Sequence, residues 1–254
     1  MIGIGARAFS VSAALLALCG SSGAAEIKVL SASIVKPALE EILPAFERAS
    51  GNKVVIGYAS TGEISQRLFK REVIDVVLVG RGELARLIKD KKLTDGTTVA
   101  RTGYGIAVKK GAPQPDVSTP EALKKTLLAA KSIGQPSLAR GGATAFTVQR
   151  VFARLRISDQ VQAKIKFAPA KTSVSAMVAN GDVEIGVQRL TELVAAPGID
   201  IIGLLPDRLQ DVTEVTAAVT TASKQADAGR ALIQRLTSPE AKAVFQAKGL
   251  AMGM

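Results

Sequence analysis

Short strand-like runs alternate with amphipathic helical stretches along most of this chain of 254 residues. In the first half, each of the runs IKVL, KVVIGY and DVVLV is followed by a helical pattern, which begins near Val35, Glu63 and Glu83 respectively. Strands and helices in this order form a mostly parallel sheet with helices packed against its faces. The sequence therefore predicts an α/β fold.

Two of the predicted strand-to-helix turns carry hydroxyl side chains. Ser31 and Ser33 follow the first strand, and Ser60 and Thr61 follow the second. A helix start leaves backbone N–H groups without partners, and the helix dipole adds partial positive charge there, so such turns can bind anions. Serine and threonine are also ordinary helix caps, and the pattern alone does not separate the two roles.

The chain is expected to pass between two lobes twice. VARTGYGIAVKKG, at residues 99–111, predicts one long connecting strand, after which a second alternating series begins. Near Glu214, VTAAVTT predicts a second connecting strand, and two helical stretches follow it. We expect residues 26–103 and 215–254 to form lobe 1 and residues 104–214 to form lobe 2. The alternative is one continuous α/β domain.

Residues 1–25 have the pattern of a signal peptide, which predicts export to the periplasm. Arg7 precedes the apolar stretch AFSVSAALLALCG, which is too short to span a bilayer, and Ala25 stands at a plausible cleavage point. Cys19 offers an alternative, lipid-anchored form, but Leu18 before it suits that processing poorly.

Composition argues against several kinds of enzyme. The chain has no histidine, and its one cysteine lies in the predicted leader. Ser-His-Asp triads, histidine metal ligands, disulfides and cysteine nucleophiles are therefore excluded from the mature chain, and we expect neither catalysis nor a cofactor or metal. Ser60 in YASTG nearly matches the nucleophile elbow of hydrolases, but it lacks the first glycine and an activating histidine. A secreted hydrolase is the less supported alternative.

The formal net charge of +11 favours anionic partners. Nucleic acid is not expected, because aromatic residues make up only 4% of the chain and the basic residues are dispersed, with KDKK at 89–92 as the local cluster. The sequence therefore favours a small anion as the ligand.

The order of several motifs resembles the periplasmic solute-binding proteins of bacterial ABC importers, specifically the molybdate-binding family. These motifs are IKVLSASIVKPALEEILPAFE, VVIGYASTGEISQRL, IDVVLVG, GYGIAVKKG, DVSTPEAL and SPEAKAVFQAKG. The resemblance implies a two-lobed periplasmic-binding-protein fold of type II with two crossover strands. It also implies a monomer that binds a tetrahedral oxyanion such as molybdate or tungstate and delivers it to an ABC permease in the inner membrane.

The same resemblance implies which residues contact the ligand. Ser33 and Ser60, with Thr61 adjacent, correspond to the hydroxyl donors of the first lobe. Ala143 or Thr144, in the Gly-rich turn RGGATA, corresponds to a backbone donor of the second lobe.

A second backbone donor is expected at Val174, and three further positions bear on the ligand. Gln188 stands where the family often has a tyrosine, and its amide differs from a phenol in length and geometry. Arg81 follows the third predicted strand, and Arg140 precedes the Gly-rich turn of the second lobe. A guanidinium that reaches the cleft from either position suits a carboxylate. A small di- or tricarboxylate therefore stays open as the ligand, as does a role in reporting the ligand to a membrane sensor. Each arginine can equally be a solvated surface residue.

Overall fold

The computed structural model describes residues 24–136, 143–169 and 172–250. The predicted leader up to residue 23, Cys19 within it, and Arg140 lie outside these ranges. Within the described ranges, no helix is both long and apolar enough to cross a membrane.

Ten strands form two sheets among the described residues. The first sheet contains β1 (Glu26–Ala32), β2 (Lys53–Ala59), β3 (Val76–Gly80), β4 (Leu93–Thr102) and β10 (Thr213–Thr220), in the order β2-β1-β3-β10-β4. The second contains β5 (Tyr104–Lys109), β6 (Ile133–Gln135), β7 (Ile165–Phe167), β8 (Ile185–Arg189) and β9 (Ile199–Leu204), in the order β7-β6-β8-β5-β9.

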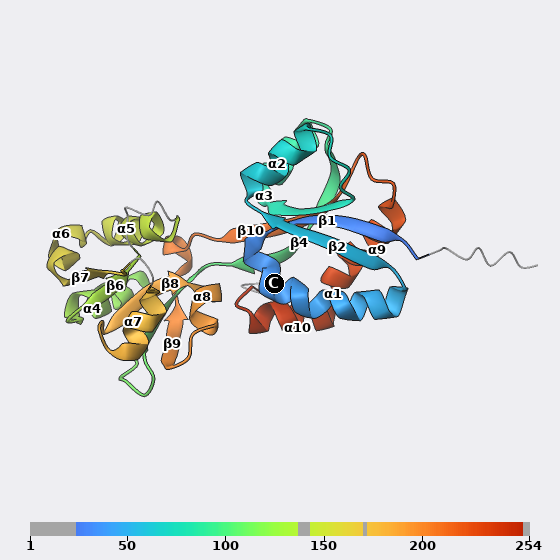
Figure 1. Cartoon of the computed structure of the whole chain (residues 1–254). Coiled ribbons are helices and arrows are strands. Elements are labelled where there is room, and N and C mark those ends of the chain that lie inside the picture. Colours follow the sequence, from blue (N-terminus) through green and yellow to red (C-terminus); the bar gives the residue numbers. More distant parts are fainter. Residues whose placement is uncertain (1–23, 137–142, 170–171, 251–254) are drawn as a thin grey trace, which may run out of the picture.

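Helices accompany each sheet, and the result is two lobes (Figure 1). The first lobe carries α1 (Lys36–Ser50), α2 (Thr61–Phe69), α3 (Arg81–Lys89), α9 (Ala226–Leu236) and α10 (Pro239–Ala247). The second carries α4 (Pro120–Ala129), α5 (Ala143–Leu155), α6 (Ser158–Val161), α7 (Val174–Asn180) and α8 (Leu190–Val194). The two-lobed α/β architecture predicted from the sequence is confirmed.

The first sheet is covered on both faces. Strand β1 pairs in parallel with β2 and β3, whereas β10 runs antiparallel to β3 and β4. The stripe of Leu39, Ile42 and Phe46 on α1 is buried against one face together with α9 and α10, and Ile64 and Leu87 from α2 and α3 belong to the core on the other. Burial of such a side chain contributes about 1.5–3 kcal/mol.

The second sheet repeats this arrangement. Strand β6 pairs in parallel with β7 and β8, and β5 runs antiparallel to β8 and β9. One core gathers Tyr104 and Phe152, and a smaller core gathers Met177 and Val178 of α7. A Cβ on Gly186 would come within 2.6 Å of Val178, so the close approach of α7 to the sheet requires glycine there.

The chain crosses between the sheets at two places. The predicted single strand at 99–111 is two strands in different sheets, because β4 ends at Thr102 and β5 begins at Tyr104, with Gly103 alone between them. The chain returns through residues 205–212 into β10. The side chain of Gln210 in this return segment accepts a 2.8 Å hydrogen bond from the N–H of Tyr104 and donates a 2.9 Å bond to its carbonyl.

The two crossings and the two sheets make up a type II two-lobed fold, as the resemblance implied. The lobe boundaries given above stay a prediction. The end of lobe 1 also contacts lobe 2, because Gly249, which follows α10 with φ of 71°, lies against the backbone of Leu190 at the start of α8. A Cβ at Gly249 would be 3.0 Å from the carbonyl carbon of Leu190.

Candidate functional site

The residues that follow β1, β2 and β3 gather at one edge of the first sheet. This follows from the parallel pairing, in which Ser31 lies opposite Tyr58 of β2 and Leu78 of β3. Ser33 is exposed at the start of a 3-10 helix, and Thr61 is half-buried as the first residue of α2. Parallel strands present their carboxyl ends at the same edge, which is where ligands of α/β proteins bind.

Ser60 is an N-cap residue as well as a predicted ligand contact. Its hydroxyl oxygen accepts a 3.3 Å hydrogen bond from the N–H of Glu63, and the side chain is exposed. The hydroxyl proton remains available for donation to an anion. Ser31, by contrast, is fully buried, and its hydroxyl donates to the carbonyl of Ala32. The structure thus places Ser33, Ser60 and Thr61 at one edge, and their contact with a ligand stays a prediction.

Arg81 and Arg101 flank Glu214 at the same edge. Arg81 opens α3 and lies 2.8 Å from one carboxylate oxygen of Glu214, and Arg101 lies 2.9 Å from the other. The hydrogen bond from Arg81 is the main cause that lowers the pKa of Glu214. A pocket of about 320 Å³ adjoins this group, and its lining comprises Gly80, Arg81, Gly82, Val212, Thr213 and Glu214. Arg81 is therefore an ion-paired residue of the edge with a side chain that is still 74% exposed.

Arg189, at the end of β8, brings a third guanidinium to the crossover. It donates a 2.8 Å hydrogen bond to the hydroxyl of Tyr104 and a 3.0 Å bond to the hydroxyl of Thr213 in β10. Within the described residues no carboxylate pairs with it. Because Thr213 and Glu214 are neighbours in β10, three guanidinium groups and one carboxylate surround the start of this strand. The local surplus of positive charge attracts anions.

The edge of the second sheet carries the predicted donors of lobe 2. Helix α5 begins at Ala143, with Thr144 half-buried in its first turn, and α7 begins at Val174, which is buried. Strand β6 is parallel to both β7 and β8, so the three strands end at the same edge of the sheet. Helices α5, α7 and α8, which follow β6, β7 and β8, therefore begin at this edge. Arg140, predicted at this edge, lies outside the described residues.

Gln188 is buried and bonded to a carboxylate. Its amide nitrogen donates to Glu192 of α8, whereas its amide oxygen is buried without a partner in the part of the chain that the structure describes. Glu192 lines a pocket of about 550 Å³ together with Ser173 and Ser175, whose hydroxyl oxygens are 2.9 Å apart. An unpaired buried polar atom is costly, which favours a role for Gln188 in contacting or shaping a ligand site.

Sequence reasoning did not identify Arg189, Glu192, Ser173 and Ser175 as site residues. Arg189 directly follows Gln188, so the motif VQRL contained its signal. Ser173 is an N-cap that accepts a 3.0 Å bond from the N–H of Ala176, and this capping pattern was also readable from the sequence. The bonds of Arg189 to Tyr104 and Thr213 depend on the tertiary structure, whereas Glu192 bonds Gln188, four residues earlier.

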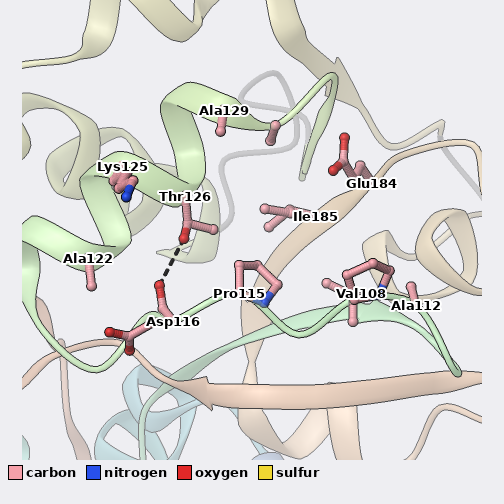
Figure 2. Close-up of a pocket in the computed structure, with 12 residues that line it drawn as sticks. Val108, Ala112, Pro115, Asp116, Ala122, Lys125, Thr126, Ala129, Glu184 and Ile185 are labelled. Atoms are coloured by element: carbon pink, nitrogen blue, oxygen red, sulfur yellow. Dashed lines mark hydrogen bonds between the residues drawn. The ribbon is translucent and has the colours of Figure 1, made fainter.

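Another cavity lies in the second lobe, beside α4 and the C-terminal end of β5 (Figure 2). Its volume is about 460 Å³, and apolar side chains such as Val108, Pro115 and Ile185 line most of it. Thr126 donates a 2.8 Å hydrogen bond to the carbonyl of Asp116 at its rim. None of the predicted ligand contacts that the structure describes lines this cavity, and its apolar wall suits a small anion poorly.

Among the described residues, no group of three or more histidine, cysteine, aspartate or glutamate side chains is placed to hold a metal ion. The chemistry that the two edges offer includes hydrogen bonding, guanidinium charge and the carboxylates of Glu192 and Glu214.

Comparison with known proteins gives one matching family model and several relatives. The model described as bacterial extracellular solute-binding protein matches residues 27–251. Aconitate isomerase from a Pseudomonas species is 35% identical over 231 residues, covering 88% of this chain and 87% of the relative. The molybdate-binding protein ModA of Azotobacter vinelandii is 26% identical over 251 residues, covering 94% of each chain.

Solved structures show the same fold. The substrate-binding domain assigned to a molybdenum ABC transporter of Clostridium difficile superposes with a TM-score of 0.79 at 18% identity, covering 89% of this chain and 98% of that one. The tungstate-binding protein TupA of Desulfovibrio alaskensis gives a TM-score of 0.66 at 13% identity, covering 89% and 98%. At these identities the likeness concerns the fold alone.

Proposed function

Since this chain belongs to the family of bacterial extracellular solute-binding proteins, the substrate-binding components of ABC transporters, we propose that it captures a small organic polycarboxylate between its two lobes. The observation that carries this proposal is the guanidinium cluster of Arg81, Arg101 and Arg189 around Glu214 at the start of β10. The captured anion would pass to an ABC permease, and the protein would work outside the cytoplasm.

The charge of the cluster favours carboxylates over oxyanions such as molybdate or tungstate. Hydroxyl and backbone donors alone can enclose a tetrahedral oxyanion, and a planar guanidinium instead matches the two oxygens of a carboxylate. Arg81 is ion-paired with Glu214, but most of its side chain is exposed. Its guanidinium can therefore leave the carboxylate of Glu214 and bind a carboxylate of the ligand. The relative with 35% identity supports this class, because its name specifies aconitate, a tricarboxylate.

The serine turns complete the proposed site. Ser33 and Ser60 lie at the edge of lobe 1, and Ser173 and Gln188 at the edge of lobe 2. On closure of the lobes, the hydroxyls and helix N-terminal N–H groups would replace the water around carboxylate oxygens that do not reach an arginine. The family's mode of binding thereby accommodates a larger, more highly charged ligand.

Calorimetry with citrate, cis-aconitate, trans-aconitate, molybdate, tungstate and sulfate tests the proposal. A tricarboxylate should bind most tightly, and Arg81→Gln should weaken its binding about 10- to 100-fold, as expected for one charge-assisted hydrogen bond. Arg230→Gln is the matched control, because it removes an exposed guanidinium paired to Asp227 on α9. Tight binding of molybdate with no response to any carboxylate would refute the proposal.

A second candidate function, isomerisation of the bound carboxylate, is favoured by the name of the same relative and by Glu192. Moving the double bond of an aconitate requires a base that removes a proton from the methylene carbon and returns a proton to the former vinylic carbon, with no net change in atoms. Without histidine, a carboxylate, lysine or tyrosine side chain must serve. The lowered pKa of Glu214 makes it a poor base, whereas Glu192 is bonded to a neutral amide and lines the lobe 2 pocket.

Proton NMR in D₂O distinguishes binding from isomerisation. Interconversion of cis- and trans-aconitate with uptake of deuterium, lost in Glu192→Gln but kept in Glu121→Gln of the exposed face of α4, would establish catalysis. If Glu192→Gln still binds the ligand and the wild type never interconverts the isomers, the protein is a binding protein only.

A further inference from the structure

The turns that end α2 and α3 meet at the sheet edge opposite the candidate site. Both helices begin at the site edge and run back along the sheet, so their last residues lie near the starts of β3 and β4. Phe69, the last residue of α2, joins the two turns. Its ring is 43% exposed, and its centroid lies 5.6 Å from the guanidinium carbon of Arg86 and 5.4 Å from the ammonium nitrogen of Lys92.

The same two turns carry several lysine and arginine side chains. We call this surface the basic end, and it comprises Phe69, Lys70, Arg71, Val73, Lys89, Lys91 and Lys92. None of its five cations forms an ion pair with any residue that the structure describes. The nearby Arg67 is different, because it is paired with Glu72 at 2.5 Å. The carboxylate of Asp90 pairs with Arg86 in the same way, so the basic end keeps a net positive charge beside an exposed aromatic side chain.

Two of these cations lie in turns closed by backbone hydrogen bonds. Arg71 and Lys91 have left-handed backbones, with φ of 60° and 54°. Each turn is closed by a hydrogen bond back to its helix, from Glu72 N to Arg67 O at 3.2 Å and from Lys92 N to Leu87 O at 2.9 Å. Glycine is the usual residue at such positions, although a cation there interacts favourably with the helix C-terminus.

We propose that the basic end binds the surface of an anionic phospholipid bilayer. Four of the five cations are exposed and Lys92 is half-buried, and together they do not enclose a pocket, so they suit an extended anionic layer better than a small ion. Clustered lysine and arginine attract anionic headgroups, and exposed aromatic and apolar side chains such as Phe69 and Val73, the latter 45% exposed, prefer the interface between headgroups and acyl chains. Bound in this way, the protein keeps the opposite edge, with Ser60 and Arg81, free for a ligand.

Sedimentation with lipid vesicles tests this inference independently of the ligand. The purified protein should bind vesicles that contain one quarter phosphatidylglycerol, but not pure phosphatidylcholine, and binding should be lost in 500 mM NaCl. Each cation near the membrane contributes about fivefold, so Arg71→Gln with Lys91→Gln should weaken partitioning about 25-fold. Lys70→Gln with Lys89→Gln should weaken partitioning by the same factor. This second pair separates the effect of charge from that of the backbone, because neither residue has a left-handed backbone.

The second lobe provides a matched control. Arg156 is exposed, has φ of 56° and follows α5 in a turn closed by the bond from Ile157 N to Phe152 O at 3.0 Å. Arg156→Gln with Lys125→Gln of α4 removes the same charge from lobe 2 and should change partitioning less than about twofold. Absence of binding to the anionic vesicles, or an equal loss in the control and the basic-end variants, would overturn the inference.

Discussion

The guanidinium of Arg189 lies 4.9 Å from the centre of the Tyr104 ring and donates a 2.8 Å hydrogen bond to the hydroxyl of the same tyrosine. Tyr104 is the first residue after one crossover, and Arg189 also donates to Thr213 on the other. One side chain of lobe 2 therefore connects both crossings and contributes to the positive charge of the proposed site.

Tyr104→Phe should lower the free energy of unfolding by about 1 kcal/mol, because it removes the acceptor of Arg189 and leaves a buried ring in place. Urea unfolding measures this change. Tyr58→Phe is the control, since the hydroxyl of Tyr58 is buried without a partner among the described residues, and its removal should be neutral or stabilising. Equal effects of the two substitutions would contradict the role of the Arg189 contact.

Glu214 should make the stability of the protein depend on pH in the acidic range. Its pKa in the folded protein is lowered, first by the hydrogen bond from Arg81, so its contribution is complete above the ordinary value of 4.5 and is lost as the pH falls through the folded-state pKa. The difference in unfolding free energy between wild type and Glu214→Gln should be at most about 1 kcal/mol at pH 7 and should shrink in acid.

Glu214→Gln should also tighten polycarboxylate binding, because Arg81 then lacks its internal counter-charge. Glu72→Gln is the matched control: the pKa of Glu72 is likewise lowered by a hydrogen bond, from Arg67, far from the proposed site. It should reproduce the pH dependence and leave ligand affinity unchanged. Calorimetry that finds weaker binding in Glu214→Gln would argue that this carboxylate itself contacts the ligand.

Ser33→Ala and Ser60→Ala should each weaken ligand binding by about 1.5–3 kcal/mol through loss of one charge-assisted hydrogen bond. Ser60→Ala should in addition cost about 1 kcal/mol of stability, because Ser60 caps α2. Ser238→Ala removes the equivalent cap of α10, which accepts from Ala241 at 3.2 Å, and should lower stability alone. If Ser33→Ala and Ser60→Ala both bind the ligand as tightly as the wild type, the ligand binds elsewhere.

Gly249→Ala should destabilise the protein more than Gly51→Ala does. Both glycines have φ of 71°, so each alanine should cost about 1–2 kcal/mol from backbone strain. Gly51 has open space around it, whereas Gly249 lies against the backbone of Leu190 in the other lobe. Thermal unfolding of the two variants separates strain from contact, and an equal loss would mean that the contact between lobes contributes nothing.

Much of the fold was predictable because it follows from local patterns. Alternation of strand and helix fixes parallel pairing, and parallel pairing brings Ser33, Ser60 and Arg81 to one edge without further information. The lobe boundary was expected between residues 103 and 104, but the break of the connecting strand at Gly103 was not predicted, because residues 99–111 have one continuous strand-forming pattern. Only the hydrogen-bond partners of the two strands differ.

The site was less predictable than the fold because its charges pair over long distances in the sequence. Arg81 and Glu214 are 133 positions apart, and nothing in either local segment specifies the other. Glu192 bonds Gln188, four residues earlier, whereas the partners of Arg189 depend on where Tyr104 and β10 lie in space. The ligand contacts predicted from the family resemblance keep the status of predictions.

The single residue between β4 and β5 sets where any closing rotation must pivot. Gly103 permits little displacement of one strand relative to the other, and Gln210 fastens the return segment to Tyr104 beside it. Ser60 follows β2, at the far side of its sheet from β4, whereas α7, which follows Ser173, packs against β8 and β5 near the crossover. In a rotation about this point the Ser60 turn would move farthest while Arg101 and Arg189 would move little, so in the proposed site the arginines would bind a carboxylate before the Ser60 turn encloses it.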